Sequence, residues 1–317
     1  HVVSADEALR LLPDVLDAYD EPPGNASSLP TFACARLGQS MGVTTLIGGD
    51  GGDEIFGGNE RYRKDAILQA FFRLPAFAKR SLGMLADVGE SIDWRPWNRV
   101  RNFVRRGSIP NPDRFYTDDA FASEYFGTLL GPAFRGAVGA DDSLNHMREV
   151  YARIEAPSEL HRLMELDLEM TIADNDIVKV SRAVKACGMA VRFPYLDRRL
   201  VEYAGTLPAS AKVRRGEKRF LFKRAMSDVL PDEILRKKKQ GFGLPTAVWF
   251  REHPGFRAML DEVLLGRRTQ ERGLFETQQI RSIVRRHEKG AWDHGAEIWY
   301  LLVLELWIRK YLEPAAA

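Results

Sequence analysis

Three carboxylate side chains stand among glycines in one short segment, residues 48–58. Asp50, Asp53 and Glu54 follow an apolar run at residues 43–47, which predicts a short buried strand. Glycines just past a strand let the backbone turn sharply and approach a ligand closely, and open α/β sheets bind ligands at that edge. Phosphates gain nothing from three nearby anions unless Mg²⁺ lies between them. The segment therefore predicts a site for a metal ion and a nucleotide, the alternative being a surface turn rich in glycine and aspartate.

The elements around this segment predict a sheet flanked by helices. Helical periodicity covers residues 5–19 and 29–41, the strand at 43–47 follows, and another helix comes after the glycines. This order is half of a doubly wound sheet, whose other strands we expect upstream. Residues 66–145 alternate helical stretches with Pro/Gly breaks and predict a helical insertion or cap, while residues 297–312 predict a buried helix. The expected fold is α/β and predominantly helical.

One long helix is predicted to begin at residue 163 and to continue to residue 184. Apolar residues recur there at spacings of three and four, which places them on one buried stripe. Asp174, Asp176 and Lys179 lie off this stripe. They either face the glycine-rich segment or are solvated, and we favour solvation.

Composition narrows the classes of function. The 317 residues contain 46 Lys and Arg against 44 Asp and Glu, a formal net charge of +2, so bulk charge does not indicate a nucleic-acid partner. Cys34 and Cys187 are too few for a disulfide scaffold and lack a Cys-x-x-Cys spacing, which favours a reducing cytoplasm. The six histidines are scattered, which argues against zinc.

The sequence predicts a large core and no membrane partner. With 45% hydrophobic residues, the chain can form one large domain or two. Its N-terminus lacks a basic stretch followed by an apolar core, so no signal peptide is expected. The most apolar window, residues 298–308, is interrupted by Glu305 and is far shorter than the ~20 residues that a span needs.

Four blocks of this sequence, in the same order, resemble the asparagine synthetase family. They are residues 48–58 with Arg61 and Tyr62, residues 179–183 leading to 191–202, residues 216–221, and residues 236–245 with Trp249. The first block is similar to the family's signature Ser-Gly-Glu/Asp-Gly-x-Asp-Glu-Leu-Phe-Gly-Gly-Tyr. The second is similar to its segments Asp-Arg-x-Ser-Met and Arg-x-Pro-Phe-Leu-Asp.

The resemblance implies an ATP-dependent amide ligase with a PP-loop ATP pyrophosphatase-like fold. Such enzymes activate the side-chain carboxylate of aspartate as an acyl-adenylate, which ammonia derived from glutamine then attacks. Complete members also carry an N-terminal glutaminase that begins with cysteine and a pyrophosphate loop, Ser-Gly-Gly-x-Asp-Ser. Neither occurs in this sequence, so we expect the C-terminal synthetase portion of a longer protein.

The resemblance also implies two parts of the chain and a set of partners. Residues 1–65 are expected to be the C-terminal part of the α/β nucleotide-binding core, and residues 66–317 the helical portion of the same domain. The expected partners are aspartate, ammonia, and the glutaminase and PP-loop portion of the parent protein. A homodimer is a further option, whereas neither nucleic acid nor a membrane is expected.

By resemblance, five residues receive roles in the reaction. Gly48 and Gly49 contact ATP through their backbone. Asp50 occupies the position of an acidic residue that helps to form the intermediate and organises the amine nucleophile. Asp53 matches a carboxylate that binds Mg²⁺. Lys218 matches a lysine that stabilises negative charge on the α-phosphate.

Four further residues have two interpretations each. Glu54 either joins the site or stabilises the first turn of the following helix, where carboxylates are favoured by the helix dipole. Lys237, Lys238 and Lys239 are secondary candidates for contacting pyrophosphate, although a run of lysines is usually a solvated face.

Three positions depart from the family pattern, namely Gly48, Ser181 and Ala190, where serine, aspartate and glutamate are usual. Because the glutamate is expected near the site, Ala190 indicates another acceptor, another nucleophile or lost activity. Arg182 and Arg192 persist, and they either hold a carboxylate or phosphate by two hydrogen bonds or pair with buried acids. Besides the ammonia-using ligase, two alternatives therefore stay open: an amidotransferase or β-lactam-synthetase-like ligase with another acceptor, and a degenerate homologue without activity.

Overall fold

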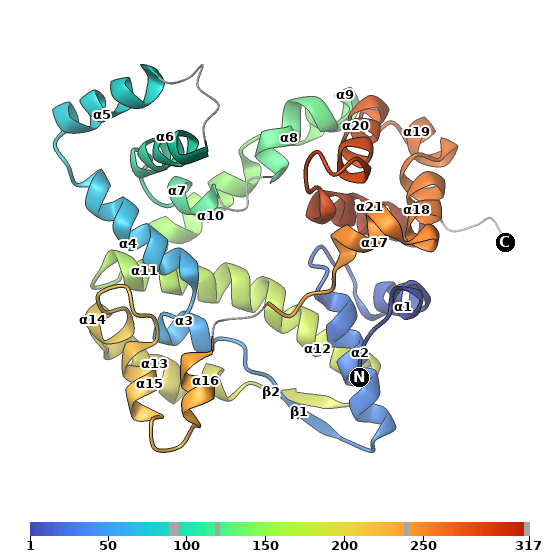
Figure 1. Ribbon diagram of the computed structural model, residues 1–317. Coiled ribbons are helices and arrows are strands. Elements are labelled where there is room, and N and C mark those ends of the chain that lie inside the picture. The colour runs from blue at the N-terminus through green and yellow to red at the C-terminus, as the bar shows by residue number, and fades with distance from the viewer. Residues whose placement is uncertain (89–94, 118–120, 238–240, 314–317) are drawn as a thin grey trace.

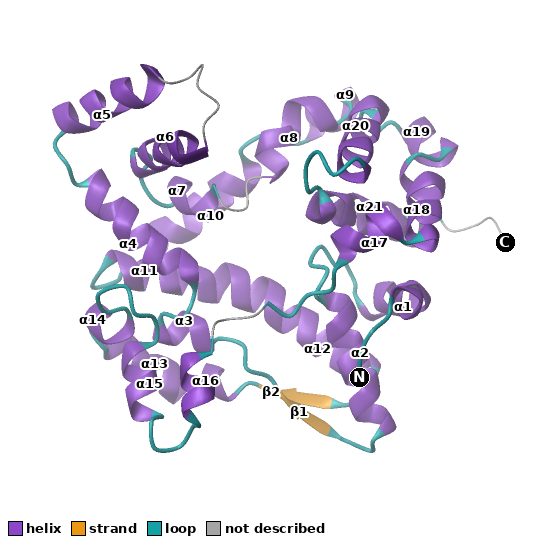
Figure 2. Cartoon of the chain, in the orientation of Figure 1, coloured by secondary structure: helices purple, strands orange, loops and turns teal. Residues whose placement is uncertain are grey.

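The structure, a computed structural model, describes residues 1–88, 95–117, 121–237 and 241–313. Figures 1 and 2 show a chain built mostly of helices, with one small sheet. The helices before the sheet's second strand are α1 Ala5–Ala18, α2 Ser28–Ser40, α3 Gly52–Phe56, α4 Glu60–Phe72, α5 Ala76–Val88, α6 Arg95–Gly107, α7 Asp113–Tyr116, α8 Phe121–Leu129, α9 Pro132–Ala137, α10 Asp142–Arg153, α11 Glu159–Asp167, η1 Leu168–Asp176 and α12 Ile177–Ala186. Those after it are η2 Pro194–Leu196, α13 Arg198–Thr206, α14 Ala209–Lys212, α15 Phe220–Ala225, α16 Asp232–Arg236, α17 Thr246–Glu252, α18 Pro254–Met259, η3 Leu260–Leu264, α19 Arg267–Arg272, α20 Thr277–Glu288 and α21 Gly295–Tyr311. The expectation of a predominantly helical α/β chain is confirmed.

The sheet in the described part of the chain consists of β1 (Thr45–Ile47) and β2 (Ala190–Arg192). The strands are parallel, with Leu46 opposite Val191. We expected a buried strand here, and that expectation is wrong, because the side chain of Ile47 is 77% exposed. In this part of the chain β1 has a hydrogen-bonded neighbour on one edge only, so Ile47 has no further strand to pack beside.

Helices α11, η1 and α12 run end to end as one rod through the centre of the molecule (Figure 1). The rod confirms the long helix predicted over residues 163–184. Its middle part, η1, is a π-helix, which has more residues per turn than an α-helix. The predicted stripe is therefore not buried throughout: Ala173 is exposed, whereas Ile172, which lies outside the stripe, is buried. A period of 3.6 residues does not hold across π turns, and this part of the prediction is wrong.

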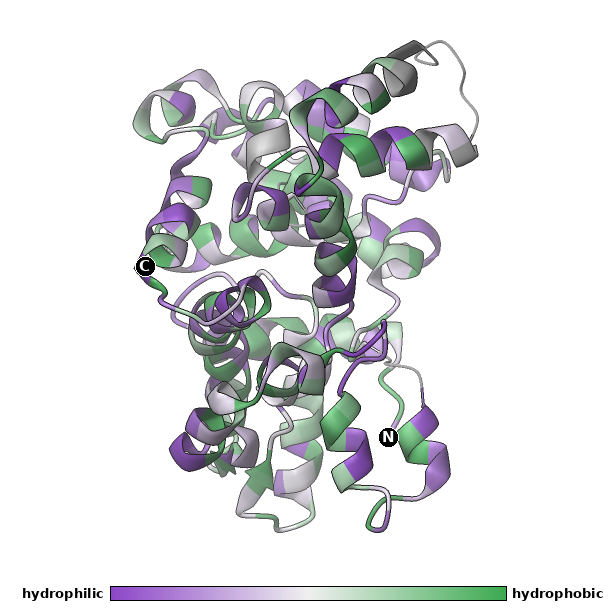
Figure 3. Cartoon of the chain, turned by 90° about the vertical axis from the view of Figure 1, so that its left-hand side faces the viewer, coloured by the Kyte–Doolittle hydropathy of each residue, from purple (hydrophilic) through white to green (hydrophobic). Residues whose placement is uncertain are grey.

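The main hydrophobic core holds α12 against the first and last helices. One cluster of buried side chains includes Leu12 and Val15 of α1, Val184 of α12, and Trp299 and Leu302 of α21. The helices predicted near both ends of the chain are thus confirmed. Most helices carry both hydrophobic and hydrophilic residues, as Figure 3 shows. Among the described residues, no helix is both long and apolar enough to cross a membrane.

A second core surrounds α11, at the other end of the rod. Leu163 and Leu166 of α11 pack there with Tyr62 of α4, Phe115 of α7 and Val150 of α10. The helical character predicted for residues 66–145 is confirmed over the described part of that range. Each end of the rod is therefore anchored in its own core, and its middle part, η1, lies between them.

Candidate active site

The glycine-rich segment turns the chain from β1 into the short helix α3. The N–H group of Gly48 extends the strand pairing by donating a hydrogen bond to the carbonyl oxygen of Arg192 at 2.8 Å. Gly51 has a φ of +86°, and a Cβ atom there would lie 2.2 Å from Cδ2 of Leu196. Both the conformation and the space therefore require glycine at this position. The segment begins where the parallel strands end, which is the edge where such sheets bind ligands.

A cavity of about 700 Å³ lies beside this turn. Residues 48–54 line it together with side chains of η1 and α12. Small-molecule sites typically measure about 300–1,000 Å³, so a nucleotide is within range. A Cβ atom at Gly49 would have no heavy atom within 4 Å. The backbone of Gly49 is thus accessible, which the expected ATP contact needs.

Gly48, the other expected ATP contact, is crowded. A Cβ atom there would lie 2.7 Å from ring atoms of Phe193 and 2.9 Å from Oδ2 of Asp50. The serine that is usual at this position would collide with the ring, so Phe193 explains why glycine stands here. The other two departures from the family pattern, Ser181 and Ala190, do not line the cavity.

Asp50 shares the cavity with two charged residues of the rod. Asp176 and Lys179 also line it, and Nζ of Lys179 lies 2.5 Å from Oδ1 of Asp176. Burial raises the pKa of Asp50, the Asp176 carboxylate raises it further, and Lys179 partly opposes the rise. Our preference for solvated side chains fits Asp174, which is exposed, but is wrong for Asp176 and Lys179. The π turns of η1 end at Asp176, so the 3.6-residue period behind the predicted stripe does not hold up to this residue.

Asp53, the expected metal ligand, lies in the first turn of α3 and lines the cavity. Its Oδ1 atom is 3.7 Å from Nη1 of Arg219, and it packs so closely over Gly58 that a Cβ atom there would be 1.8 Å away. Glu54 also lines the cavity but is only 6% exposed. Its place in the first turn of α3 suits the helix dipole as well, so both interpretations of Glu54 fit the geometry.

The carboxylates of the cavity wall fit a magnesium ion that takes some of its ligands from a phosphate. Over the described ranges, no group of three or more His, Cys, Asp or Glu side chains could hold a metal ion by itself. Mg²⁺ in nucleotide sites is usually held by one or two carboxylates together with substrate phosphates and waters. Asp53 on the cavity wall is suited to that role, and nucleotide phosphates, waters or a further carboxylate would have to supply the remaining ligands.

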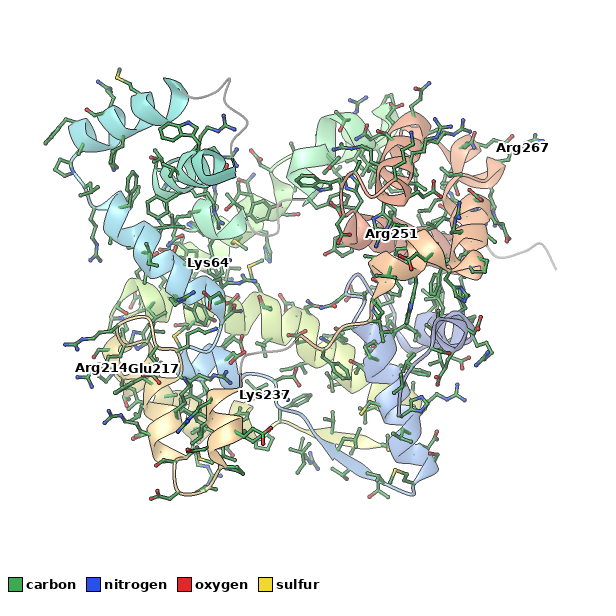
Figure 4. The ribbon with its side chains drawn as sticks, viewed as in Figure 1. Lys64, Arg214, Glu217, Lys237, Arg251 and Arg267 are labelled. Atoms are coloured by element: carbon green, nitrogen blue, oxygen red, sulfur yellow. The ribbon has the colours of Figure 1, made fainter. Side chains whose placement is uncertain are left out.

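Lys218 does not line the cavity. Its Nζ atom lies 2.9 Å from Oε2 of Glu60, and the residue follows the turn bridged by Arg214 and Glu217, both labelled in Figure 4. The next residue, Arg219, lines the cavity instead. The role of Lys218 in the chemistry of ATP stays a prediction.

The remaining candidates lie away from the cavity or outside the described residues. Lys237 directly follows α16 and is exposed (Figure 4), while Lys238 and Lys239 are not among the described residues. Arg182 forms an ion pair with the exposed Asp20, and Arg192 is exposed. Neither arginine lines the cavity or pairs with a buried acid in the described structure.

Sequence reasoning assigned no role in the site to three charged members of the cavity wall: it favoured solvation for Asp176 and Lys179 and gave no role to Arg219. The spacing of three between Asp176 and Lys179 was a usable signal, because it puts an acid and a base side by side on one helix. Arg219 gave no such signal. It has a φ of +53°, a conformation uncommon outside glycine, which only the structure reveals.

The fold and the cavity define a helical α/β protein in which a carboxylate-bearing glycine loop follows a parallel strand. The sequence matches the family described as asparagine synthase over residues 1–309. This chain therefore belongs to the asparagine synthase family.

Similar curated proteins carry related names. A putative asparagine synthetase (glutamine-hydrolyzing) of Mycobacterium tuberculosis is 27% identical over 314 residues, which cover 98% of this chain and 46% of that protein. Asparagine synthetase (glutamine-hydrolyzing) 1 of Bacillus subtilis is 22% identical over 309 residues, covering 96% of this chain and 46% of the relative. Amidase chry2 of Gibberella zeae is 23% identical over 277 residues, which cover 78% of this chain and 39% of that protein. The chain spans about half the length of the first two relatives.

Proposed function

We propose that this chain is the synthetase portion of an asparagine synthetase, an ATP-dependent amide ligase. The observation that supports the proposal is the cavity of about 700 Å³ in which the glycine loop places Asp50 close to Asp176 and Lys179. An accessible backbone at Gly49 and a carboxylate at Asp53 border the same space. Retention of these groups argues against a degenerate homologue.

The first step proposed is activation of the aspartate side chain. Its carboxylate oxygen attacks the α-phosphate of ATP, a C–O–P linkage forms, and pyrophosphate leaves. The site must stabilise negative charge on the phosphates during this step. Gly48 and Gly49 would contact ATP through their backbone, Asp53 would hold Mg²⁺, and Lys179 and Arg219 would add positive charge at the wall. Bound Mg²⁺ would neutralise part of the phosphate charge.

The second step proposed is attack of ammonia on the activated carbonyl carbon. A C–N bond forms, the C–O bond to phosphate breaks, and AMP leaves. The attacking nitrogen must also lose a proton, and we assign its acceptance to Asp50. Because burial and the Asp176 carboxylate raise the pKa of Asp50, its carboxylate is a stronger base than an ordinary aspartate.

The rest of the parent protein is proposed to complete the reaction. Relatives about twice the length of this chain are named glutamine-hydrolyzing. A glutaminase region would supply ammonia, and a pyrophosphate loop would add phosphate contacts and a second carboxylate for Mg²⁺. We further propose a cytoplasmic location, which suits the small number of cysteines.

ATP–pyrophosphate exchange in the full-length protein that contains this chain tests the proposal. Exchange should require both aspartate and Mg²⁺, and Asp50→Asn should lower amide formation by about a hundredfold. Asp174→Asn is the matched control, because Asp174 is exposed on the same rod and does not line the cavity. Absence of aspartate-dependent exchange would contradict the proposal, and exchange driven by a different carboxylic acid would favour the ligase with another substrate.

A further inference from the structure

Positive charge is concentrated in one part of the chain. Residues 61–109 contain eleven Lys and Arg against four Asp and Glu, a net charge of +7, whereas the whole chain carries +2. One of the four acids, Asp65, is buried and pairs with Arg114 at 2.8 Å, and the other three lie between residues 87 and 93. The rest of the chain is therefore net negative. Such an asymmetry predicts a surface that attracts an anionic partner.

The basic region includes helices α4, α5 and α6, and the last two lie together at one end of the molecule (Figure 1). Phe71 of α4 and Val104 of α6 are buried against each other, and α5 packs on α6. In the described structure, α5 and α6 contribute no residue to the two main hydrophobic cores and none to the wall of the cavity beside the glycine-rich segment. The two helices therefore project from the part of the molecule that holds the candidate site.

The outward face of α5 carries large apolar side chains. Phe77 is 75% exposed and Met84 is 63% exposed. The two residues are seven positions apart, which is close to two helical turns, so they lie on one face with Arg80 between them. On α6, Val100 and Phe103 are also exposed and lie one turn apart. Exposed apolar side chains of this size, grouped on one pair of helices, indicate an interaction surface.

The same surface presents arginines that are available to a partner. Arg73, Arg80 and Arg105 are exposed, and none of them forms an ion pair within the described residues. A partner must therefore offer negative charge and an apolar interior together. An anionic lipid surface offers both, because arginine keeps its charge at the headgroups while aromatic and aliphatic side chains enter the acyl region. A second copy of this surface would bring like charges together.

We propose that the exposed face of α5, with the arginines beside it, binds the surface of a membrane that contains anionic lipids. The inference goes beyond the ligase function and does not depend on it. Phe77 and Met84 enter the boundary between headgroups and acyl chains, and Arg73, Arg80 and Arg105 contact lipid phosphates. Such contact needs neither a signal peptide nor a spanning helix, whose lack was the reason to expect no membrane partner. It suits a cytoplasmic location, because the cytoplasmic leaflet carries anionic lipids.

Vesicle binding tests the proposal directly. The full-length protein that contains this chain is sedimented with vesicles of equal parts phosphatidylglycerol and phosphatidylcholine, and with vesicles of phosphatidylcholine alone. Binding to the anionic vesicles should be saturable, at least about tenfold tighter than binding to the neutral ones, and weaker at high salt. No binding to the anionic vesicles, or equal binding to both kinds, would overturn the proposal.

Substitution of the apolar side chains tests the location. Phe77→Ser combined with Met84→Ser should weaken binding to the anionic vesicles by about tenfold, because less apolar surface leaves water. Tyr203→Ser combined with Val229→Ser is the matched control, since these side chains are 59% and 69% exposed outside the basic region, and it should leave binding unchanged. Equal effects of the two pairs would overturn the proposal. Urea denaturation checks that all four substitutions leave the fold intact.

Substitution of the arginines tests the charge. Arg73→Gln, Arg80→Gln and Arg105→Gln together should weaken binding by about a hundredfold, because each cation near an anionic surface contributes about 1 kcal/mol. Arg281→Gln, Arg285→Gln and Lys289→Gln, at exposed positions near the C-terminal half of α20, are the control and should leave binding unchanged. Equal losses in both triple variants would show that overall charge and not this surface attracts the vesicles, which would overturn the proposal.

Two other anionic probes separate a lipid surface from other classes of partner. Polyglutamate stands for an acidic protein and a DNA duplex for a nucleic acid. Both should bind more weakly than the anionic vesicles, because neither offers an apolar interior to Phe77 and Met84. Binding to either probe that equals vesicle binding and is unchanged by Phe77→Ser with Met84→Ser would assign the surface to that polyanion and overturn the proposal.

Discussion

The Nζ atom of Lys218 lies 2.9 Å from Oε2 of Glu60, so this lysine forms an ion pair and does not line the cavity beside the glycine-rich segment. Both side chains are partly exposed, and such pairs contribute only about 0–1 kcal/mol. Breaking the ion pair with Glu60 would therefore cost little free energy. Lys218 would then be able to pair with a phosphate of a bound nucleotide, which carries a stronger negative charge than the carboxylate.

We expect Lys218→Ala to slow adenylate formation by about tenfold to a hundredfold while changing ATP affinity much less. The reason is that charge on the α-phosphate develops mainly in the transition state. Single-turnover pyrophosphate release measures the first quantity, and calorimetry with ATP measures the second. Lys223→Ala, which removes a lysine paired with Glu217 on the same segment, is the control. A large loss of ATP affinity with unchanged chemistry would contradict the assignment.

The crowding at Gly48 predicts unequal effects of serine at two adjacent glycines. Gly48→Ser should lower the free energy of unfolding by about 1–3 kcal/mol, because its Cβ would press on the ring of Phe193. Gly49→Ser meets no heavy atom within 4 Å and should change stability far less. Urea denaturation of the two variants measures the difference. Adding Phe193→Val to Gly48→Ser should restore most of the loss, and no recovery would show that the ring is not the cause.

The charges beside Asp50 predict shifts of the pH–rate profile in opposite directions. Burial and Asp176 raise the pKa of Asp50, so a carboxylate acting as base is lost as the pH falls through this raised value. Asp176→Asn removes the like charge, and the acidic limb of kcat/KM should move to lower pH. Lys179→Met removes the opposing cation, and the limb should move to higher pH. If the acidic limb of kcat/KM moved in the same direction in both variants, Asp50 would not control this limb.

Because Lys212 is buried, we expect the free energy of unfolding to rise at alkaline pH. This lysine is 3% exposed, and burial lowers its pKa to about 8 from 10.5. Between these values the unfolded chain holds a proton that the folded chain has lost, so the free energy of unfolding increases with pH there. Lys212→Met should remove this rise and should stabilise the protein at pH 7 by up to about 3 kcal/mol.

Denaturation from pH 7 to 10.5 measures this effect. The exposed Lys185, replaced by methionine, serves as the control and should leave the pH dependence as it is in the unaltered protein. Parallel stability curves for Lys212→Met and the unaltered protein would show that burial does not perturb this lysine.

Local patterns predicted those parts of the site that depend on neighbours in the sequence. The glycines and carboxylates at residues 48–58 were enough to predict which segment would border a cavity, because glycines just past a strand let the backbone turn sharply. Burial was harder to predict. Ile47 has the apolar character of a core residue, but whether it is covered depends on strands that its own sequence does not specify.

Long-range placement and unusual helix geometry explain the remaining misses. Asp176 and Lys179 lie off the apolar stripe that a 3.6-residue period predicts, yet they line the cavity with Asp50, and the π-helix η1 ends at Asp176. Lys218 and Arg219 are adjacent in sequence, yet the conformation of Arg219 directs its side chain to Asp53. No pattern of residue types encodes such a choice between neighbours.

The rod that carries Asp176 is fixed at both ends, since α11 packs in one hydrophobic core and α12 packs in the other. In an α-helix each residue turns the chain by about 100°, so removing one residue from the middle would rotate one end relative to the other by that amount. Leu163 and Val184 could then not both stay buried. The π segment η1 thus sets the rotational phase between the two cores, and insertions or deletions within it would be selected against even where no residue of the site is changed.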